Sequence, residues 1–338
     1  MRMGLLSFRD VHVEFARKGR APVHAVAGVD LDLEEGEILG LVGESGCGKS
    51  TLARAGVGLM PLSGGEVVFD GEPIRHVRGR ARPERERKLQ MVFQDPFASL
   101  NPRRRIGEQI TDALRGHASR QERRRRAGAL LEQVGLEARD APRYPHQFSG
   151  GQRQRIAIAR ALAPEPRVIV ADEPVAALDA SIQAQVANVL VELRRDLGLS
   201  ILFISHDLSL VRHVCDRVAV MYLGRIAELG PTASMWRLPL HPYTEALIRA
   251  VPHPEQVGVA PSGLPGEVPD PADPPDGCVF HPRCPYAHDA CMPEHPSLRT
   301  VGDARQVACV LHEPGGQARR PEEAARAPAG ERPGGAHP

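Results

Sequence analysis

The chain has 338 residues, and its 43 basic and 42 acidic side chains leave a formal net charge of +1. This length can bury one large core, or one core with an appendage. The nearly balanced charge excludes a whole-chain field that would guide the protein to nucleic acid or anionic lipid. Two local runs, residues 75–88 and 120–126, are rich in arginine. Solvated helix faces account for such runs without a ligand.

The first ten residues, MRMGLLSFRD, contain no charged segment followed by an apolar one. No stretch approaches the roughly 18–20 apolar residues of a membrane helix. We therefore expect a chain that stays in the cytoplasm and acts at a membrane only through a partner.

The first expected elements are strands. Alternating apolar residues between positions 5 and 32 predict half-exposed strands, and residues 37–42 predict a buried one. From about 94 to 162 the apolar residues recur every three or four positions, which indicates helices. Two fully apolar runs follow, at 168–171 and 201–204, on either side of a helical stretch. Apolar strands joined by helices predict a parallel sheet covered on both faces.

The last third of the chain differs in composition. Between residues 252 and 296 proline is so frequent that long helices and central strands are not expected. We predict that something other than a hydrophobic core holds this region. From about residue 315 the chain is rich in Gly, Pro, Ala and charged residues, which predicts disorder.

Residues 43–50, GESGCGKS, fit the phosphate-binding pattern G-x-x-x-x-G-K-[ST] between a buried strand and a helical segment. Glycines let successive backbone N–H groups converge on phosphate oxygens, and the following helix adds the positive end of its dipole. We expect Lys49 to contact the β- and γ-phosphates and Ser50 to bind Mg²⁺. The predicted nucleotide-binding residues of this loop are Gly43, Glu44, Ser45, Gly46, Cys47, Gly48, Lys49, Ser50 and Thr51.

Carboxylates follow the apolar run at 168–171. Asp172 is expected at the carboxyl end of this strand, where ligands of open parallel sheets bind, as a partner of Mg²⁺. Glu173 is the candidate general base or water-positioning group. His206 follows the next core strand in the same way, and its imidazole could hydrogen-bond a γ-phosphate. Each signal is weak alone, because many strands end in acidic turns, but the phosphate loop gives them a shared ligand.

Residues 148–152, FSGGQ, closely resemble the signature sequence of the ABC (ATP-binding cassette) family, with Phe148 in place of the commoner Leu. A serine and two glycines expose amides at a helix N-terminus, which forms an anion site. The resemblance implies that this site closes on ATP held by a second subunit, so that two chains enclose two nucleotides. The residues that it assigns to this contact are Ser149, Gly150, Gly151 and Gln152.

Further family elements can be placed by residue. Gln94 matches the glutamine that touches Mg²⁺ or water and senses the membrane partner, and residues 177–179, with Asp179, match the D-loop. Phe15 lies where an aromatic ring usually stacks on adenine, although a core phenylalanine is an alternative. Residues 174–176 depart slightly from the usual Pro-Thr-Ser. The resemblance covers residues 5 to about 311.

The resemblance implies an α/β fold of the P-loop NTPase class, with a RecA-like parallel sheet and an N-terminal antiparallel β subdomain. It places an ATPase domain at 1–232, with an inserted helical subdomain at about 94–165. HPYTEAL at 241–247 and PRCP at 282–285 resemble the small C-terminal extension of oligopeptide, dipeptide and nickel importer ATPases. This extension is expected at 233–315, followed by a disordered tail at 316–338.

The function that the resemblance implies is hydrolysis of ATP, with Mg²⁺, to power uptake of oligopeptides or dipeptides. The chain would bind peripherally at the cytoplasmic face of the cell membrane, with two transmembrane permease subunits and, indirectly, an extracytoplasmic solute-binding protein. A heterodimer with a paralogous ATPase subunit is expected rather than a homodimer. Import of nickel or another small solute is one alternative. An ABC ATPase acting on nucleic acid is the other, supported only by the arginine-rich runs, and we expect no nucleic-acid partner.

Four cysteines lie in the proline-rich region and beyond it: Cys278, Cys284, Cys291 and Cys309. Disulfides would not normally persist in a chain without a secretion signal, which favours a metal. The intervening five, six and seventeen residues match neither common zinc-ribbon spacings nor a bacterial ferredoxin run. The importer family includes members with a [4Fe–4S] cluster at such cysteines, so the resemblance implies an iron–sulfur cluster. A four-thiolate Zn²⁺ site and free thiols or disulfides are the alternatives.

Overall fold

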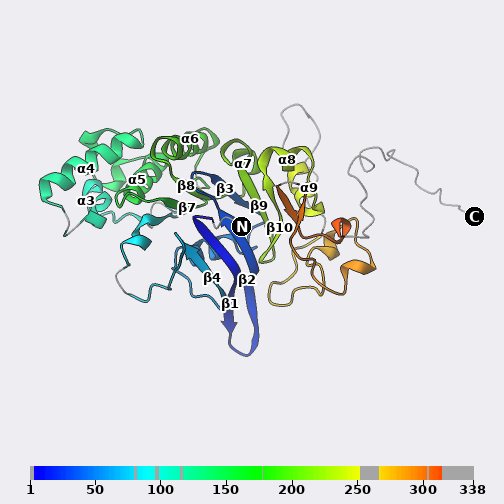
Figure 1. Ribbon diagram of the computed structural model, residues 1–338. Helices are drawn as coiled ribbons and strands as arrows, with labels where there is room; N and C mark the ends of the chain where they lie inside the picture. Colours follow the sequence, from blue (N-terminus) through cyan, green and yellow to red (C-terminus); the bar gives the residue numbers. More distant parts are fainter. Residues whose placement is uncertain are drawn as a thin grey trace, which may run out of the picture.

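The computed structural model describes residues 4–79, 82–95, 99–114, 116, 118–176, 178–251, 266–302 and 304–313. The expected disordered tail and Ala177 of the D-loop match lie outside the described residues. Figure 1 shows a central sheet with helices on one side, a smaller antiparallel sheet below it, and the C-terminal region beside β9 and β10.

The central sheet has eight strands in the order β11-β12-β10-β9-β3-β8-β7-β6. From β9 to β6 each strand is parallel to its neighbour, and the rest of the sheet is antiparallel. The predicted parallel sheet is therefore confirmed. The strands are β3 (Ile38–Val42), β6 (Leu89–Val92), β7 (Val168–Asp172), β8 (Ser200–Ile204), β9 (Arg217–Tyr222), β10 (Arg225–Pro231), β11 (Arg299–Val301) and β12 (Arg305–Val307).

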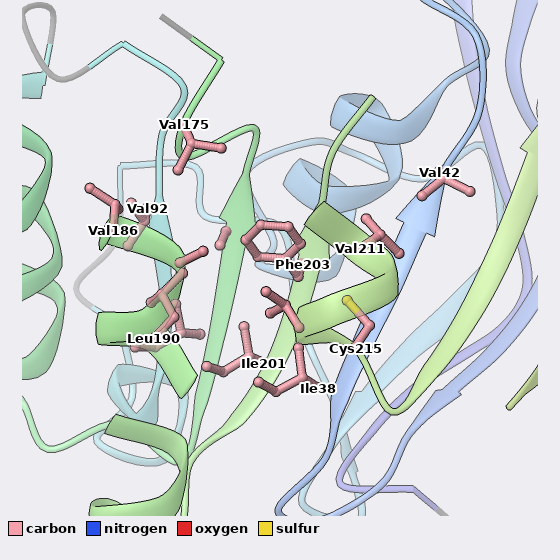
Figure 2. Close-up of a cluster of buried hydrophobic side chains, with 14 of the residues drawn as sticks. Ile38, Val42, Val92, Val175, Val186, Leu190, Ile201, Phe203, Val211 and Cys215 are labelled. Carbon is pink, nitrogen blue, oxygen red and sulfur yellow. The ribbon is translucent and has the colours of Figure 1, made fainter. Parts of the chain in front are cut away.

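The parallel strands are buried on both faces, because alternate side chains of a strand point in opposite directions. In β3, Ile38 belongs to one apolar cluster and Leu39 to the other. Figure 2 shows the first cluster, in which Phe203 of β8 lies between Leu190 and Val211 of two covering helices. The helices on this face are α5 (Gly150–Leu162), α6 (Ala180–Leu197) and α7 (Leu208–Val214).

The opposite face packs against α1 (Lys49–Gly56) and a second sheet of strand order β2-β1-β4-β5. Its antiparallel strands are β1 (Leu6–Arg17), β2 (Arg20–Leu33), β4 (Gly64–Phe69) and β5 (Glu72–Pro73). Helix α1 approaches β1 closely at Gly56, where an added Cβ would lie 2.8 Å from Cζ of Phe8. The antiparallel sheet therefore supports the helix that follows the phosphate loop.

A helical region lies beyond β6, at the left of Figure 1. Its short connections are 3-10 turns, and the side chain of Ser119 caps α4 by accepting a hydrogen bond from the Glu122 amide at 3.1 Å. The elements that lead into and form this region are η1 (Arg85–Lys88), α3 (Ile106–Ile110), η2 (Asp112–Leu114), α4 (Arg120–Gln133), η3 (Ala138–Asp140) and η4 (Pro145–Gln147), followed by α5.

The C-terminal region packs on the main core. We predicted that something other than a hydrophobic core holds it, and this is wrong for residues 278–280, because Val279 and Phe280 are buried members of the main apolar cluster. The Phe280 ring centroid lies 5.3 Å from those of both Tyr222 and Tyr243. The elements here are α8 (Thr232–Arg237), α9 (Pro242–Arg249), η5 (His281–Arg283), η6 (Asp289–Cys291), β11, β12 and η7 (Val310–His312).

One buried carboxylate joins three parts of this region. Glu228 of β10 is fully buried and accepts hydrogen bonds from the backbone N–H groups of Leu240 and His241. It also accepts one from the guanidinium of Arg305 in β12. His241 in turn caps α9, because its Nδ1 accepts the Tyr243 amide at 3.0 Å. The start of α9 and strand β12 are thus held to β10 through the same charge.

Candidate nucleotide site

Four neighbouring parallel strands of the central sheet have their carboxyl ends side by side. Ligands of open α/β sheets bind at these carboxyl ends, which we call the sheet edge. The phosphate loop follows β3, and Gln94 lies two residues beyond β6. Asp172 ends β7 and Glu173 comes next, while His206 lies two residues beyond β8. The sheet order alone therefore brings the predicted phosphate, magnesium and water-handling residues to a common edge.

The loop conformation needs glycine at two positions. Gly48 has φ of 105° and Gly43 has φ of 153°, both in a region that L side chains rarely adopt. A Cβ at Gly48 would overlap the carbonyl oxygen of Ala25, and one at Gly43 would overlap that of Met221. Helix α1 begins directly after Gly48, so its free N–H groups and positive dipole end face the loop.

Lys49 lies inside the loop and is 4% exposed. Its Nζ donates to the carbonyl oxygens of Gly43 at 2.7 Å and Glu44 at 2.8 Å. Cys47 packs beside it, and burial raises the pKa of this thiol, with the nearby ammonium of Lys49 opposing the shift. The loop thus holds a cation at its centre beside a neutral thiol.

Ser50 and Asp172 form the oxygen pair of the site. Ser50 Oγ donates to Asp172 Oδ1 at 2.7 Å, although 122 residues separate them. Burial raises the pKa of Asp172, and the hydrogen bond from Ser50 opposes this rise. A hydroxyl beside a buried carboxylate is a set of hard oxygen donors, which fits Mg²⁺.

Glu173 receives two polar groups at one oxygen. Gln94 Nε2 donates to Glu173 Oε2 at 3.0 Å, and His206 Nδ1 lies 3.5 Å from the same atom. Glu173 has φ of 46°, which is unusual for a residue with a side chain, and its amide donates to Ile204 O at 3.1 Å. Such backbone strain concentrates at functional sites. The edge of the sheet therefore presents one oriented carboxylate next to the phosphate loop.

The other predicted residues lie on separate elements. Ser149 and Gln152 form a capping box at the start of α5, since each side chain accepts the other's backbone N–H. Asp179 is the exposed residue before α6. Phe15 of β1 pairs with Val23 of β2 and is 41% exposed. The alternative that Phe15 fills the core is therefore wrong.

Comparisons with known proteins agree with this arrangement. Residues 26–176 match the family model described as ABC transporter, and residues 227–291 match that for the oligopeptide/dipeptide transporter C-terminal region. The di/tripeptide transport ATP-binding protein DppF of Pseudomonas aeruginosa is 49% identical over 314 residues, 90% of this chain and 97% of that protein. The chain belongs to the ABC transporter ATP-binding proteins. The oligopeptide transport ATP-binding protein AppF of Bacillus subtilis is 47% identical over 320 residues, 91% and 97% of the two chains.

Solved ABC cassettes share the fold. The structure of cbiO1 from Clostridium perfringens, part of an ABC transporter complex, has a TM-score of 0.61 at 29% identity and covers 70% of this chain and 92% of that one. A dimeric post-hydrolysis state of the cassette MJ0796, bound to ADP and Pi, has a TM-score of 0.58 at 30% identity, covering 67% and 98%. The predicted P-loop NTPase fold, the family and the ATPase class are thereby confirmed.

No helix in the described part of this ABC protein combines the length and apolar character needed to cross a bilayer.

Four of the six cysteines of this ABC protein lie in its C-terminal region. The amide of Cys278 donates to the carbonyl of Cys291 at 2.8 Å. Burial raises the pKa of Cys284 to about 11 and that of Cys309 to about 12, and the charges of neighbouring cysteines add to both rises. All six cysteines of the chain lie in the described part, and all are free. Among the described residues, no three or more His, Cys, Asp or Glu are grouped so that they could hold a metal ion.

Two residues behind the phosphate loop cannot be singled out from the sequence. Tyr243 and Arg283 both contact Glu44, and Arg283 lies 239 residues away in the chain. HPYTEAL and PRCP, which contain these two residues, marked the family but gave no sign of a contact with the loop. Only the packing of the C-terminal region against β9 brings them there.

Proposed function

We propose that this chain binds Mg²⁺–ATP at the sheet edge and hydrolyses it to power import of oligopeptides or dipeptides. The observation that carries the catalytic part is the convergence of Gln94 and His206 on one oxygen of Glu173, beside the Ser50–Asp172 pair. The peptide substrate is supported by the names of DppF and AppF and by the match to the oligopeptide/dipeptide transporter C-terminal region.

In the proposed mechanism, the loop amides and Lys49 bind the phosphates, and Ser50 and Asp172 hold Mg²⁺. Bound Mg²⁺ would neutralise charge on the phosphate oxygens. Glu173 orients a water molecule towards the γ-phosphorus and accepts its proton as the bond to the β-phosphate oxygen breaks. Gln94 and His206 fix the carboxylate, and His206 can also hydrogen-bond a γ-phosphate oxygen. The products are ADP and inorganic phosphate.

The remaining site residues contact the nucleotide base or a second subunit. We propose that the signature, Ser149 to Gln152, contacts ATP bound by a second ATPase subunit, that Asp179 lies at the same interface, and that Phe15 stacks on adenine. The exposed positions of Ser149, Asp179 and Phe15 support contacts outside the chain's own core. We further propose that the second subunit is a paralogue, and that both bind two permease subunits at the cytoplasmic face of the membrane.

The proposed domains follow these roles. Residues 1–232 form the ATPase domain with a helical subdomain at about 94–165, and residues 233–315 form the extension.

Transport is tested with the assembled complex in liposomes. ATP turnover should rise when the solute-binding protein carries a di- or oligopeptide. Stimulation by nickel-loaded binding protein alone would assign the chain to a different solute. Salt-sensitive RNA binding without permeases would contradict a transport role altogether.

For the four cysteines we propose a [4Fe–4S] cluster that cross-links the extension. Four free thiols of the extension would supply its ligands, and burial together with the charges of neighbouring cysteines raises the pKa of both Cys284 and Cys309. Anaerobically purified protein should be brown and contain about four irons per chain. Cys284→Ser should lose this iron, whereas Cys215→Ser, at a buried cysteine before β9, should keep it. Colourless protein with one zinc would contradict the cluster.

A further inference from the structure

We infer that the C-terminal extension positions the phosphate loop through Arg283 and Tyr243, which both act on Glu44. The inference rests on the proposed nucleotide site and adds two positioning residues to it. It also gives the extension a role in ATP binding by its own chain.

Every polar group of Glu44 has a partner. Its carboxylate binds Arg283 in a bidentate pair, with Nη1 to Oε2 at 2.7 Å and Nη2 to Oε1 at 3.0 Å. Its amide donates to the hydroxyl of Tyr243 at 2.8 Å. Its carbonyl accepts from Lys49 Nζ at 2.8 Å. The extension therefore holds the side chain and the backbone N–H of Glu44. The backbone carbonyl of Glu44 contacts Lys49, the phosphate-binding lysine.

The groups that hold Glu44 are themselves fixed. The side chain of Arg283 is 3% exposed, and its Nη1 also donates to the hydroxyl of Tyr222 at 3.3 Å. The ring of Tyr243 is fully buried, 4.7 Å from that of Tyr222 between centroids, and both rings contact Phe280. A planar guanidinium paired at two atoms tolerates little displacement of its carboxylate. Glu44 is thus held by groups that pack in one cluster of buried aromatic rings.

Loss of the contacts of Glu44 with Arg283 and Tyr243 should change the conformation of the phosphate loop more than the overall fold. Without Arg283 the partly exposed Glu44 carboxylate can turn to solvent, and the Glu44 peptide can rotate. The carbonyl that holds Lys49 then moves, and the loop amides no longer converge in the phosphate-binding arrangement. Because preorganised donors bind phosphate better than mobile ones, affinity for ATP should fall.

The chain offers a matched control. Arg305 of the extension forms a second buried ion pair, with Glu228 of β10. Substitution at Arg305 weakens the attachment of β12 to β10 and keeps both side chains that contact Glu44. Arg283→Lys and Arg305→Lys each keep the charge and replace a planar guanidinium by an ammonium group, so they compare the same substitution at two places.

The experiment measures the dissociation constant of a non-hydrolysable ATP analogue for the full chain by calorimetry, with circular dichroism to confirm folding. We expect Arg283→Lys to weaken binding about tenfold and Tyr243→Phe, which removes one oxygen, about threefold. Arg305→Lys should lower the unfolding temperature and change the dissociation constant less than twofold. In the assembled transporter, Arg283→Lys should raise KM for ATP and leave kcat within about twofold.

Glu44→Gln combined with Arg283→Lys should bind ATP no more weakly than the worse single variant, because both changes break one interaction. Unchanged affinity in folded Arg283→Lys and Tyr243→Phe would overturn the inference. An equal loss in Arg305→Lys would also overturn it, since the extension would then act only as general support. If the unsubstituted chain itself bound no ATP analogue, the proposed function would fail instead.

Discussion

Gln94 Nε2 donates a hydrogen bond to Glu173 Oε2 at 3.0 Å, joining the end of β6 to the end of β7. A carboxylate held in this way can accept a proton from water only at its lone pairs that are still free. Substitution of Glu173 is therefore the most direct test of the proposed proton transfer from water.

Glu173→Gln should leave ATP binding intact and lower turnover in the assembled transporter about 10²- to 10⁴-fold, because an amide cannot act as the general base. Turnover and ATP retention are measured on the same preparation. Glu165→Gln is a suitable control, since Glu165 also has a positive φ, of 54°, but is paired with Arg126 on the surface. Full turnover in Glu173→Gln would show that another group takes the proton.

Asp172→Asn should weaken Mg²⁺-dependent ATP binding about 10- to 100-fold, with little effect on ATP binding in excess chelator. The amide keeps the size of the side chain and an oxygen that can accept from Ser50. Burial raises the pKa of Asp172, so the charge of this carboxylate costs stability in the folded chain. The variant should therefore unfold at a higher temperature when nucleotide is absent. A fall in both ATP affinity and unfolding temperature would point to misfolding rather than to a lost Mg²⁺ partner.

Acid should loosen α9 through His241. Burial, reinforced by His295 and His312, lowers the pKa of His241 to about 3 from 6.5. Between these values the unfolded chain binds the extra proton, so stability falls as the pH falls, by about 1.4 kcal/mol per pH unit. Protonated Nδ1 can no longer accept the Tyr243 amide.

His241→Asn keeps a capping side chain without this titration. Between pH 7.5 and pH 5 its free energy of unfolding should fall by about 2 kcal/mol less than that of the unsubstituted chain. Parallel denaturation profiles would contradict this.

Gly151→Ala should destabilise the helical region by about 1–3 kcal/mol, because the new methyl group would overlap Ile182 Cγ2 of α6. Adding Ile182→Ala removes the overlap, so the double variant should lose less stability than the two single losses together. At the neighbouring Gly150 a Cβ would lie 3.1 Å from Leu178 Cδ2, the end of a flexible side chain. Gly150→Ala should accordingly have a smaller effect in urea unfolding. Simple additivity at 151 and 182 would argue against the predicted overlap.

Local patterns were enough to predict the parts of the site that depend on short stretches of chain. The glycine positions of the phosphate loop and the acidic end of β7 are fixed by backbone geometry within a few residues, so the sequence shows them directly. The contact of Gln94 with Glu173 depends on β6 and β7 being neighbours, which follows from a parallel sheet only once the strand order is known. It was anticipated through the family resemblance and not from the residues alone.

The C-terminal region was the hardest to predict, because its order comes from distant contacts. Strand β12 has three residues and becomes a strand only by pairing with β10 and β11. Phe280 ends a run of only three apolar residues, 278–280, which is too short to show the periodicity of a core face, yet it is buried against Tyr222 and Tyr243. Arg283 looks like a surface residue in the sequence and is an internal ion-pair partner in the fold.

Glu228 has a consequence for any attempt to separate the ATPase domain from its extension. A chain cut after residue 232 would lose the two amides and the arginine that pair with this carboxylate, and with them the contacts that hold the extension to β10. Removing one partner of a buried ion pair typically destabilises a protein by about 3–5 kcal/mol, which is a large part of a domain's total stability. A shortened chain should therefore be markedly less stable than the full chain, which urea unfolding of the two chains would measure. The two regions have separate sequence motifs, and we expect them to unfold as one cooperative unit.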